Sequence, residues 1–271
     1  MINSYKETLR SWQLTELQKL RKINFKTSKH FAEISAVVYF FTEAGDADIY
    51  FPYTECAVLE TWRHCGLLKT IFVSNIKSRV LTSFANKWAT VTEIQIEPSL
   101  TPGNIESLSI DCISKLGSRF KTQYMLTIQD DGFPIRPGLS RFLKGWDFIG
   151  TPYRRPNLLG LAAGYLHTHW PANGGFSLRS KKFCDFVTKT WNSEKYFTLS
   201  EKLRSEDIYC TDWLPRNNRT FAHQMHWANS YVASKFSFDN SFPWTINQRP
   251  FGFHNAKAFS ELLQRDLVQS L

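Results

Sequence analysis

Two stretches decide the fold: SAVVYFF at residues 35–41 and LKTIFVS at residues 68–74. Both are short, continuous and rich in β-branched and aromatic residues, which is typical of strands buried on both faces of a sheet. The polar residues 42–53 between them predict a long loop, and residues 54–65 predict a helix that ends at Gly66. Because this order of elements forms a βαβ unit, we expect a parallel sheet with helices on its faces.

The pattern continues on both sides of this unit. Residues 91–96 and 124–128 predict two further strands, and residues 105–120 between them predict a helix. Upstream, residues 4–22 carry apolar side chains at helical spacing among many charges. We expect an amphipathic helix there, which either packs on the body of the protein or lies on a membrane.

The composition suits one globular domain. Of the 271 residues, 42% are apolar and 15% are aromatic, which is enough to bury a sizeable core and argues against disorder. We therefore predict an α/β fold of the Rossmann type, with a mostly parallel central sheet flanked by helices, as a single domain over residues 31–271. A basic amphipathic segment at residues 1–30 precedes it.

Neither a membrane span nor a disulfide framework is indicated. The longest useful apolar run, residues 36–41, is far shorter than the roughly 20 residues that a helix needs to cross a bilayer. The N-terminus lacks the apolar core of a signal peptide, so we expect a cytoplasmic protein. Five scattered cysteines without a CxxC pair predict reduced thiols.

Positive charge is concentrated at the N-terminus. The net charge is +9, and residues 1–30 hold seven basic and two acidic side chains. Such a segment suits an anionic partner, including the inner face of an anionic membrane, although a solvated helix face explains it as well. No RNP, helix-turn-helix or zinc motif is present, so we do not expect a nucleic acid partner.

Two adjacent carboxylates follow the predicted strand at residues 124–128. Asp130 and Asp131 come after Gln129 and before Gly132, at the sheet edge where open α/β sheets bind their ligands. Carboxylate oxygens suit Mg²⁺ or Mn²⁺, which commonly bridges a protein to substrate phosphates. A plain turn is the alternative interpretation of so short a motif. Asn75 ends another strand at this edge, where a nucleotide base could be recognised.

Three further motifs lie downstream: NGGFSLRS at residues 173–180, the pair Glu206-Asp207, and FGFH at residues 251–254. Together with the carboxylate motif they resemble the signature of metal-dependent nucleotide-sugar glycosyltransferases of the A-type (GT-A) fold. The residues of these motifs are most similar to those of a bacterial family of glycosyltransferases described mainly as a domain of unknown function. The resemblance covers roughly residues 35–255 and leaves the N-terminal helix outside.

The resemblance implies a metal site that holds Mn²⁺ or Mg²⁺. Asp131 matches the metal ligand, Asp130 contacts the metal or the ribose, and His254 matches the histidine that completes the site in many relatives. Gln129 replaces the first carboxylate of the family motif, which leaves the number of anionic ligands open. The alternative for His254 is a structural histidine in an aromatic pocket.

The resemblance also implies a catalytic base. Asp207 would take the proton of an acceptor hydroxyl, and Glu206 would bind the acceptor or position its neighbour. Ser205-Glu-Asp also reads as the start of a helix, and both interpretations can hold together.

Glycines and an arginine in the 173–180 motif are candidates for donor binding. Asn173, Gly174 and Gly175 form a backbone that a sugar or diphosphate could approach closely. Arg179 could pair with a phosphate, and a structural salt bridge is an equally good explanation.

These observations predict an inverting glycosyltransferase that uses a nucleoside-diphosphate sugar, with a UDP-sugar favoured. The sugar would pass to a hydroxyl of a glycan or a lipid-linked acceptor in the synthesis of cell-envelope polysaccharide. A module that binds a glycan or nucleotide without turnover is the alternative, and the glutamine in place of the first carboxylate favours it.

Overall fold

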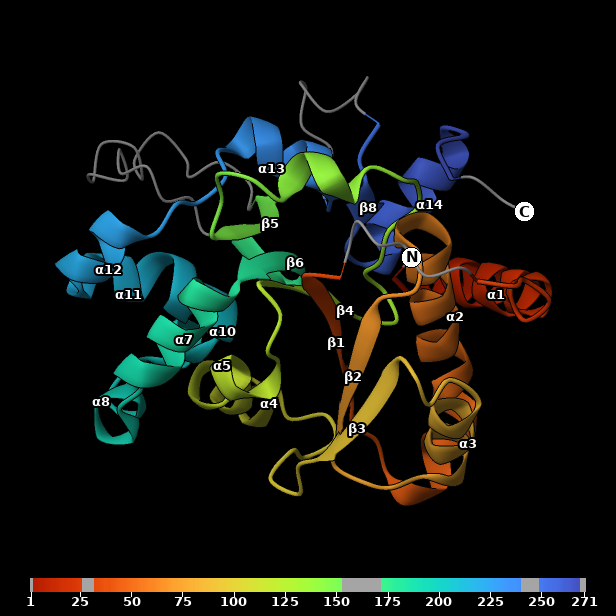
Figure 1. Ribbon diagram of the computed structural model, residues 1–271, viewed down its shortest axis with the longest axis horizontal. Coiled ribbons are helices and arrows are strands. Elements are labelled where there is room, and N and C mark those ends of the chain that lie inside the picture. The colour runs from red at the N-terminus through yellow and green to blue at the C-terminus, as the bar shows by residue number, and fades with distance from the viewer. Residues whose placement is uncertain (1, 26–31, 153–171, 240–248, 269–271) are drawn as a thin grey trace.

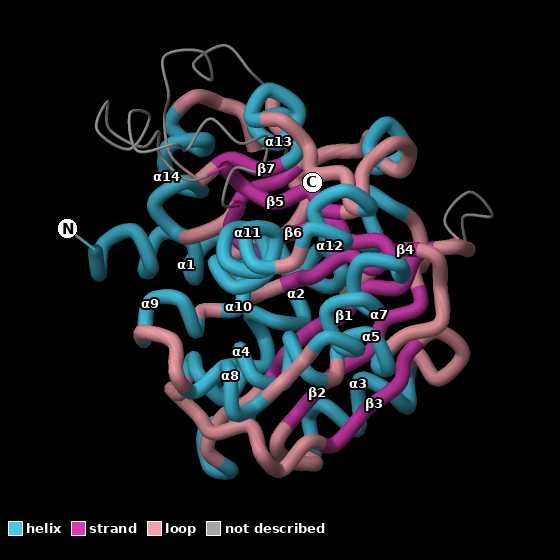
Figure 2. The backbone as a smooth tube through the Cα atoms, turned by 90° about the vertical axis from the view of Figure 1, so that its left-hand side faces the viewer, coloured by secondary structure: helices cyan, strands magenta, loops and turns pink. Residues whose placement is uncertain are grey.

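The computed structural model describes residues 2–25, 32–152, 172–239 and 249–268 (Figure 1). Its centre is a six-stranded sheet in the order β3-β2-β1-β4-β6-β5, and Figure 2 shows the strands following one another in this order. The strands are β1 Ile34–Phe40, β2 Lys69–Ser74, β3 Thr92–Ile96, β4 Tyr124–Ile128, β5 Phe148–Pro152 and β6 Ala172–Ser180. The first four are parallel, whereas β6 runs antiparallel to β4 and β5. The predicted α/β fold with a mostly parallel sheet is therefore confirmed.

Both faces of the sheet are covered, as the continuous apolar runs predict. Alternate residues of a strand point to opposite faces, and Val38 of β1 belongs to one hydrophobic core while Val37 belongs to another. β1 pairs with β2 on one side and β4 on the other. Its seven residues are buried apart from Tyr39, which is partly buried.

The helix of the βαβ unit begins earlier than predicted. α2 spans Ala47–Cys65 after a short 3-10 turn at Ala44–Asp46, so the predicted loop over residues 42–53 is wrong in its second half. Pro52 misled the prediction, because a proline inside a helix removes one backbone hydrogen bond. Burial of Phe51 against the rings of Phe40, Phe72 and Phe84 favours the helix in spite of this loss.

The helix predicted over residues 105–120 is two helices, α4 (Ile105–Ser114) and α5 (Leu116–Arg119). α5 lies against α7 (Lys181–Thr190), and the Gly117 amide donates to Thr188 Oγ1 at 3.0 Å. A Cβ on Gly117 would lie 2.9 Å from the backbone oxygen of Cys184. The helices are separated at Lys115, whose φ of −128° is not helical, and the close contact of Gly117 with α7 fixes the position of α5.

The N-terminal helix packs on the body of the protein. α1 (Ile2–Leu20) lies beside α2 and α14 (Ala256–Gln264) (Figure 1). Leu9, Leu17 and Leu20 are buried in the core that covers one face of the sheet. Of the two alternatives for this segment, contact with the body is therefore confirmed. Among the described residues, no helix is long and apolar enough to cross a membrane.

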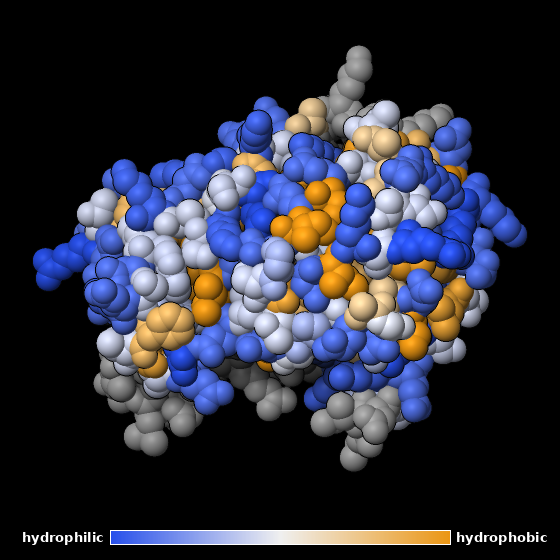
Figure 3. Space-filling view, turned by 90° about the horizontal axis from the view of Figure 1, so that it is seen from below, coloured by the Kyte–Doolittle hydropathy of each residue, from blue (hydrophilic) through white to orange (hydrophobic). Residues whose placement is uncertain are grey.

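Short helices and strands complete the chain. They are α3 Arg79–Lys87, η3 Leu139–Phe142, α8 Ser193–Phe197, α9 Glu201–Arg204, α10 Glu206–Ile208, η4 Tyr209–Trp213, α11 Leu214–Asn217, α12 Arg219–Gln224, α13 Ser230–Phe236, β7 Ser237–Phe238 and β8 Gly252–Phe253. On the face drawn in Figure 3, hydrophilic side chains dominate and hydrophobic ones form small groups. All five cysteines are buried and unpaired, as predicted.

Candidate active site

The two adjacent carboxylates lie on a tight turn at the end of β4. The Gln129 amide donates to the Gly132 carbonyl at 3.0 Å, and the Gly132 amide donates back to the Gln129 carbonyl at 3.1 Å. Asp130 and Asp131 therefore form the tip of the turn. They lie beyond the C-terminal ends of the parallel strands, as the sequence predicts.

Two helices hold this turn in place. The Gln13 amide nitrogen of α1 donates to the Asp130 carbonyl at 2.5 Å. The Asn255 backbone amide, just before α14, donates to the Asp131 carbonyl at 2.7 Å. Since the backbone carbonyls of the turn accept both bonds, the carboxylates remain available for a ligand, and their position depends on segments far away in the sequence.

The electrostatics of the turn favour a cation. Asp130 is open to a cavity on one side and surrounded by protein atoms on the others. The resulting desolvation, together with the charge of Asp131, raises the pKa of Asp130 to about 6. Desolvation also raises the pKa of Asp131, against the opposing influence of a backbone hydrogen bond and Lys6. A bound divalent cation would relieve the repulsion between these two carboxylates.

His254 lies beside the turn. Its Nε2 is 3.3 Å from Gln129 Oε1, and its Nδ1 is buried with no hydrogen-bond partner among the described residues. Burial lowers the pKa of the imidazole, which favours the neutral form that can bind a metal. The described residues contain no group of three or more His, Cys, Asp and Glu side chains placed to hold a metal ion. The predicted ligands Asp131 and His254 thus lie in one neighbourhood without forming a complete protein cage.

The two glycines of β6 make room for protein side chains. A Cβ on Gly175 would lie 2.3 Å from His254 Nε2 and 2.5 Å from Gln129 Oε1. A Cβ on Gly174 would lie 2.4 Å from Glu206 Oε2. Asn173 supports this stretch by accepting a hydrogen bond from the Gly175 amide at 2.8 Å. On the side where a Cβ would project, both glycines therefore face protein atoms, and close approach of a ligand to them stays a prediction.

Arg179 forms a buried ion pair with Glu206. Its guanidinium also donates to Ser177 Oγ at 3.0 Å and to the Gly174 carbonyl at 3.1 Å. Burial raises the pKa of Glu206, and the charge of Arg179 opposes that effect. Of the two roles that the sequence allows for Arg179, the contacts favour the structural salt bridge.

Asp207 lies in the first turn of a short helix, as one of its two interpretations predicts. α10 begins at Glu206, and Asp207 Oδ1 accepts hydrogen bonds from Ser205 Oγ at 2.6 Å and from the Ile208 amide at 2.8 Å. The charge of Asp207 influences the pKa values of both Glu206 and His254. Glu206 lies against Gly174 and His254 lies against the neighbouring Gly175, so the start of α10 is near the carboxylate turn.

Asn75 has a structural role at the sheet edge. Its side-chain oxygen accepts from the Thr42 amide and its side-chain nitrogen donates to the Thr42 carbonyl, both at 3.1 Å. These bonds tie the segment after β2 to the segment after β1. The amide is thus occupied by backbone, which the position-based prediction of base recognition did not foresee.

Comparison with known proteins assigns a family to the chain through a match in its second half. Residues 112–254 match the family described as Protein of unknown function (DUF5672). The chain belongs to this family. No curated protein matches the sequence. Among solved structures, the chain is similar to the mannosyltransferase PcManGT from Pyrobaculum calidifontis, in complex with GDP-Man and Mn²⁺. The identity is 11% and the TM-score is 0.39, over 69% of this chain and 58% of that one. This chain thus spans less than two thirds of the mannosyltransferase's length.

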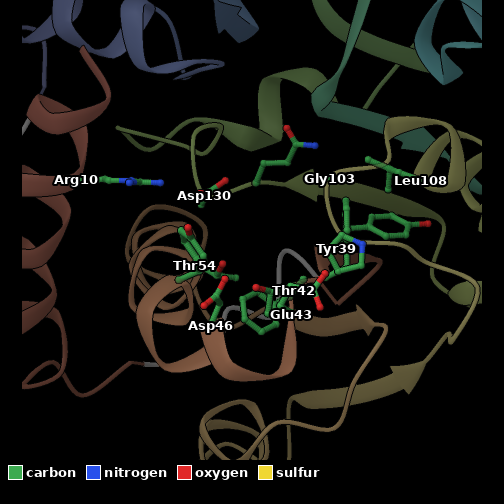
Figure 4. Close-up of a pocket in the computed structure, with 14 residues that line it drawn as sticks. Arg10, Tyr39, Thr42, Glu43, Asp46, Thr54, Gly103, Leu108 and Asp130 are labelled. Carbon is green, nitrogen blue, oxygen red and sulfur yellow. The ribbon is translucent and has the colours of Figure 1, made fainter. Parts of the chain in front are cut away.

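The DUF5672 region supplies only part of the site. A cavity of about 450 Å³ at this edge of the sheet is lined by Gln129 and Asp130 from this region (Figure 4). The other described residues of its wall precede residue 112. They are Arg10 of α1, residues 39–43 at the end of β1 and just after it, Asp46, Tyr50 and Thr54 at α2, and Pro102, Gly103 and Leu108. A second cavity, of about 860 Å³, shares Pro102 and Gly103 with it and reaches Ser205, two residues before Asp207.

Arg10 and Lys6 are site residues that sequence reasoning missed. In the sequence they are part of a basic segment. In the structure, Lys6 and Arg10 both line a smaller cavity of about 180 Å³ together with Asp130 and Asp131. Their spacing of four residues, next to the buried Leu9 and Gln13, is the available signal, because it places both charges on one helix face.

Proposed function

We propose that this protein is a glycosyltransferase of the GT-A type that moves a sugar from a nucleoside diphosphate to a hydroxyl group. The observation that carries the proposal is the turn at Asp130 and Asp131, where two adjacent carboxylates line cavities at the C-terminal edge of a parallel sheet. The ordered set of motifs at residues 129–132, 173–180, 206–207 and 251–254 supports it as well.

The residues of the turn fit a divalent cation. Mg²⁺ or Mn²⁺ would be held chiefly by Asp131, with Asp130 and His254 nearby, and would neutralise the charge that develops on the leaving diphosphate. Two carboxylates suffice, because such ions usually take their remaining ligands from substrate phosphates and water. The unpartnered Nδ1 of His254 supports the fit, since a buried imidazole nitrogen without a partner is costly unless a ligand uses it.

Asp207 is the base in this proposal. A sugar hydroxyl is a weak nucleophile until a carboxylate removes its proton, and attack from the side opposite the diphosphate would invert the anomeric carbon. Hydrogen bonds from Ser205 and Ile208 orient the carboxylate. Glu206 is held by Arg179, so it positions the start of α10 and leaves proton transfer to its neighbour. The cavity that reaches Ser205 gives room for an acceptor.

The proposal extends to the partners of the reaction. We favour a UDP-sugar as donor and a glycan or lipid-linked hydroxyl as acceptor, in the synthesis of cell-envelope polysaccharide. The exposed Lys6, Arg10 and Lys19 of α1 would allow peripheral contact with an anionic membrane.

Calorimetric titration tests the donor site. UDP, GDP, CDP and ADP are titrated with and without Mn²⁺ into the wild type, into Asp131→Asn and into the control Asp185→Asn, whose carboxylate lies on the exposed face of α7. We expect one nucleotide to bind in a manner that depends on the metal, and the Asp131 variant alone to lose this binding. If no nucleotide binds under either condition, the proposal is wrong.

Donor hydrolysis separates an enzyme from a binding module. With the nucleotide identified, release of nucleoside diphosphate from its sugars is followed for the wild type and for Asp207→Asn. Turnover that the substitution abolishes while nucleotide binding persists supports a glycosyltransferase. Binding without any turnover in the wild type favours the module instead, as does the glutamine that replaces the first carboxylate of the motif.

A further inference from the structure

The N-terminal helix brings two cations to the carboxylate turn. Lys6 and Arg10 lie one helical turn apart on α1, and both line the small cavity that Asp130 and Asp131 also line. Arg10 also lines the cavity of about 450 Å³, which we call the donor cavity because the proposed function places the nucleotide sugar there. Figure 4 shows the Arg10 side chain extending from α1 toward Asp130. The buried Leu9 and the bond from Gln13 to the Asp130 carbonyl fix the helix at this place.

Arg10 is oriented but keeps its hydrogen-bonding capacity. Its guanidinium carbon lies 5.7 Å from the centre of the Tyr50 ring and 5.1 Å from the centre of the Tyr53 ring, both on α2. The residue is exposed, its charge acts on the Asp130 carboxylate, and no hydrogen bond or ion pair joins its guanidinium to another described residue. Contact with two aromatic faces leaves the planar N–H groups free, and these groups match the geometry of phosphate oxygens.

The charged side chains around the donor cavity suit a ligand that carries both positive and negative charge. Among the described residues that line the cavity, Glu43, Asp46 and Asp130 are acidic and Arg10 alone is basic. A diphosphate alone would meet mainly repulsion there. A diphosphate with a divalent cation carries both signs, so the cation can face the carboxylates while the phosphate oxygens face the guanidinium.

We infer that α1 forms the phosphate-binding wall of the donor cavity, with Arg10 contacting the diphosphate and Lys6 adding positive charge beside it. This inference rests on the proposed function and adds a binding role to a helix that lies outside the DUF5672 region. The helix is then part of the site and not only a cover on the core.

The test compares variants of full-length protein in calorimetric titrations with Mn²⁺ and the nucleoside diphosphate that the wild type binds. The variants are Arg10→Gln, Arg10→Lys, Lys6→Gln and the control Lys22→Gln, an exposed basic residue just beyond the end of α1. A hydrogen bond to a charged group justifies an expected loss of about tenfold to a hundredfold for Arg10→Gln. Lys6→Gln loses less, Arg10→Lys recovers part of the affinity, and Lys22→Gln binds as the wild type does.

Binding of the matching nucleoside, which lacks phosphates, provides the second readout. If Arg10 contacts the diphosphate, Arg10→Gln leaves the affinity for the nucleoside unchanged. An equal loss for nucleoside and nucleoside diphosphate would assign Arg10 a purely structural role and overturn the inference. So would an Arg10→Gln protein that binds the diphosphate as tightly as the wild type. A wild type that binds no nucleoside diphosphate refutes the proposed function itself, so the two failures are distinguishable.

Discussion

The buried ion pair between Arg179 and Glu206 gives a sharp test of how the site is built. Replacing Arg179 by methionine keeps a long apolar side chain but removes the charge. The substitution leaves Glu206 without its cation and takes away the donors to Ser177 Oγ and the Gly174 carbonyl. No other described basic side chain forms an ion pair with Glu206. The variant therefore isolates the contribution of one guanidinium to the folded state.

The burial of the two side chains determines how much the substitution lowers the free energy of unfolding. The Arg179 side chain is 2% exposed and that of Glu206 is 12% exposed. Removing one partner of such a pair lowers the free energy of unfolding by about 3–5 kcal/mol, because an uncompensated charge stays in a desolvated place. The double variant Arg179→Met/Glu206→Leu removes both charges. We expect it to recover most of that loss, since apolar replacements of a buried pair are often neutral.

Urea denaturation of the wild type, both single variants and the double variant measures these terms as a mutant cycle. The pH dependence supplies a check on the cause. Burial raises the pKa of Glu206 and Arg179 opposes it, so the pKa rises further when Arg179 is lost. A carboxyl with a raised folded pKa stabilises the fold as the pH falls through that pKa. The deficit of Arg179→Met should thus shrink between pH 7 and pH 5. A cost below about 1 kcal/mol, against the expected range, or a deficit that does not shrink, would refute the reasoning.

Three further predictions concern the site and its frame. Gly175→Ala places a Cβ 2.3 Å from His254 Nε2, so we expect a loss of roughly 1 kcal/mol in stability and a clear loss of metal-dependent nucleotide binding by calorimetry. Asn75→Ala removes both bonds to the Thr42 backbone, and urea denaturation should show a cost of roughly 1–2 kcal/mol. Burial raises the pKa of Glu97, but hydrogen bonds from its partners outweigh this and lower it to about 2. Its contribution to stability is present above pH 5 and lost toward pH 2, so thermal unfolding of Glu97→Gln should depend less on pH in that range.

Strands β1, β2, β3 and β4 could be predicted from the sequence, whereas β5 and β6 were not predicted. A continuous run of β-branched and aromatic residues, as in β1 and β2, is compatible with few structures other than a strand covered on both faces. The position of Asp130 and Asp131 followed from the end of β4 alone. The start of α2 was missed because Pro52 is a strong local signal, whereas the packing of Phe51 that overrides it involves residues from three other elements.

Contacts between distant elements could not be predicted. The amphipathic pattern of α1 indicates that one face is buried, but it does not tell which surface receives that face. The sequence therefore could not predict that Arg10 and Lys6 lie beside the carboxylate turn, as they do in the structure. In the same way, the sequence allows either a phosphate or a carboxylate as the partner of Arg179. The packing of the start of α10 makes Glu206 that partner.

The region matched by the family is not a structural unit by itself. β4 lies inside residues 112–254, yet it pairs along its length with β1, which lies outside. Residues of β1, α1 and α2 share one hydrophobic core with β4, and Gln13 completes the hydrogen bonding of the carboxylate turn. A chain limited to the matched region would expose a strand edge and much of that core. The carboxylates of the matched region and the cationic helix before it therefore depend on the same packing, which is why the candidate site is a property of the whole domain.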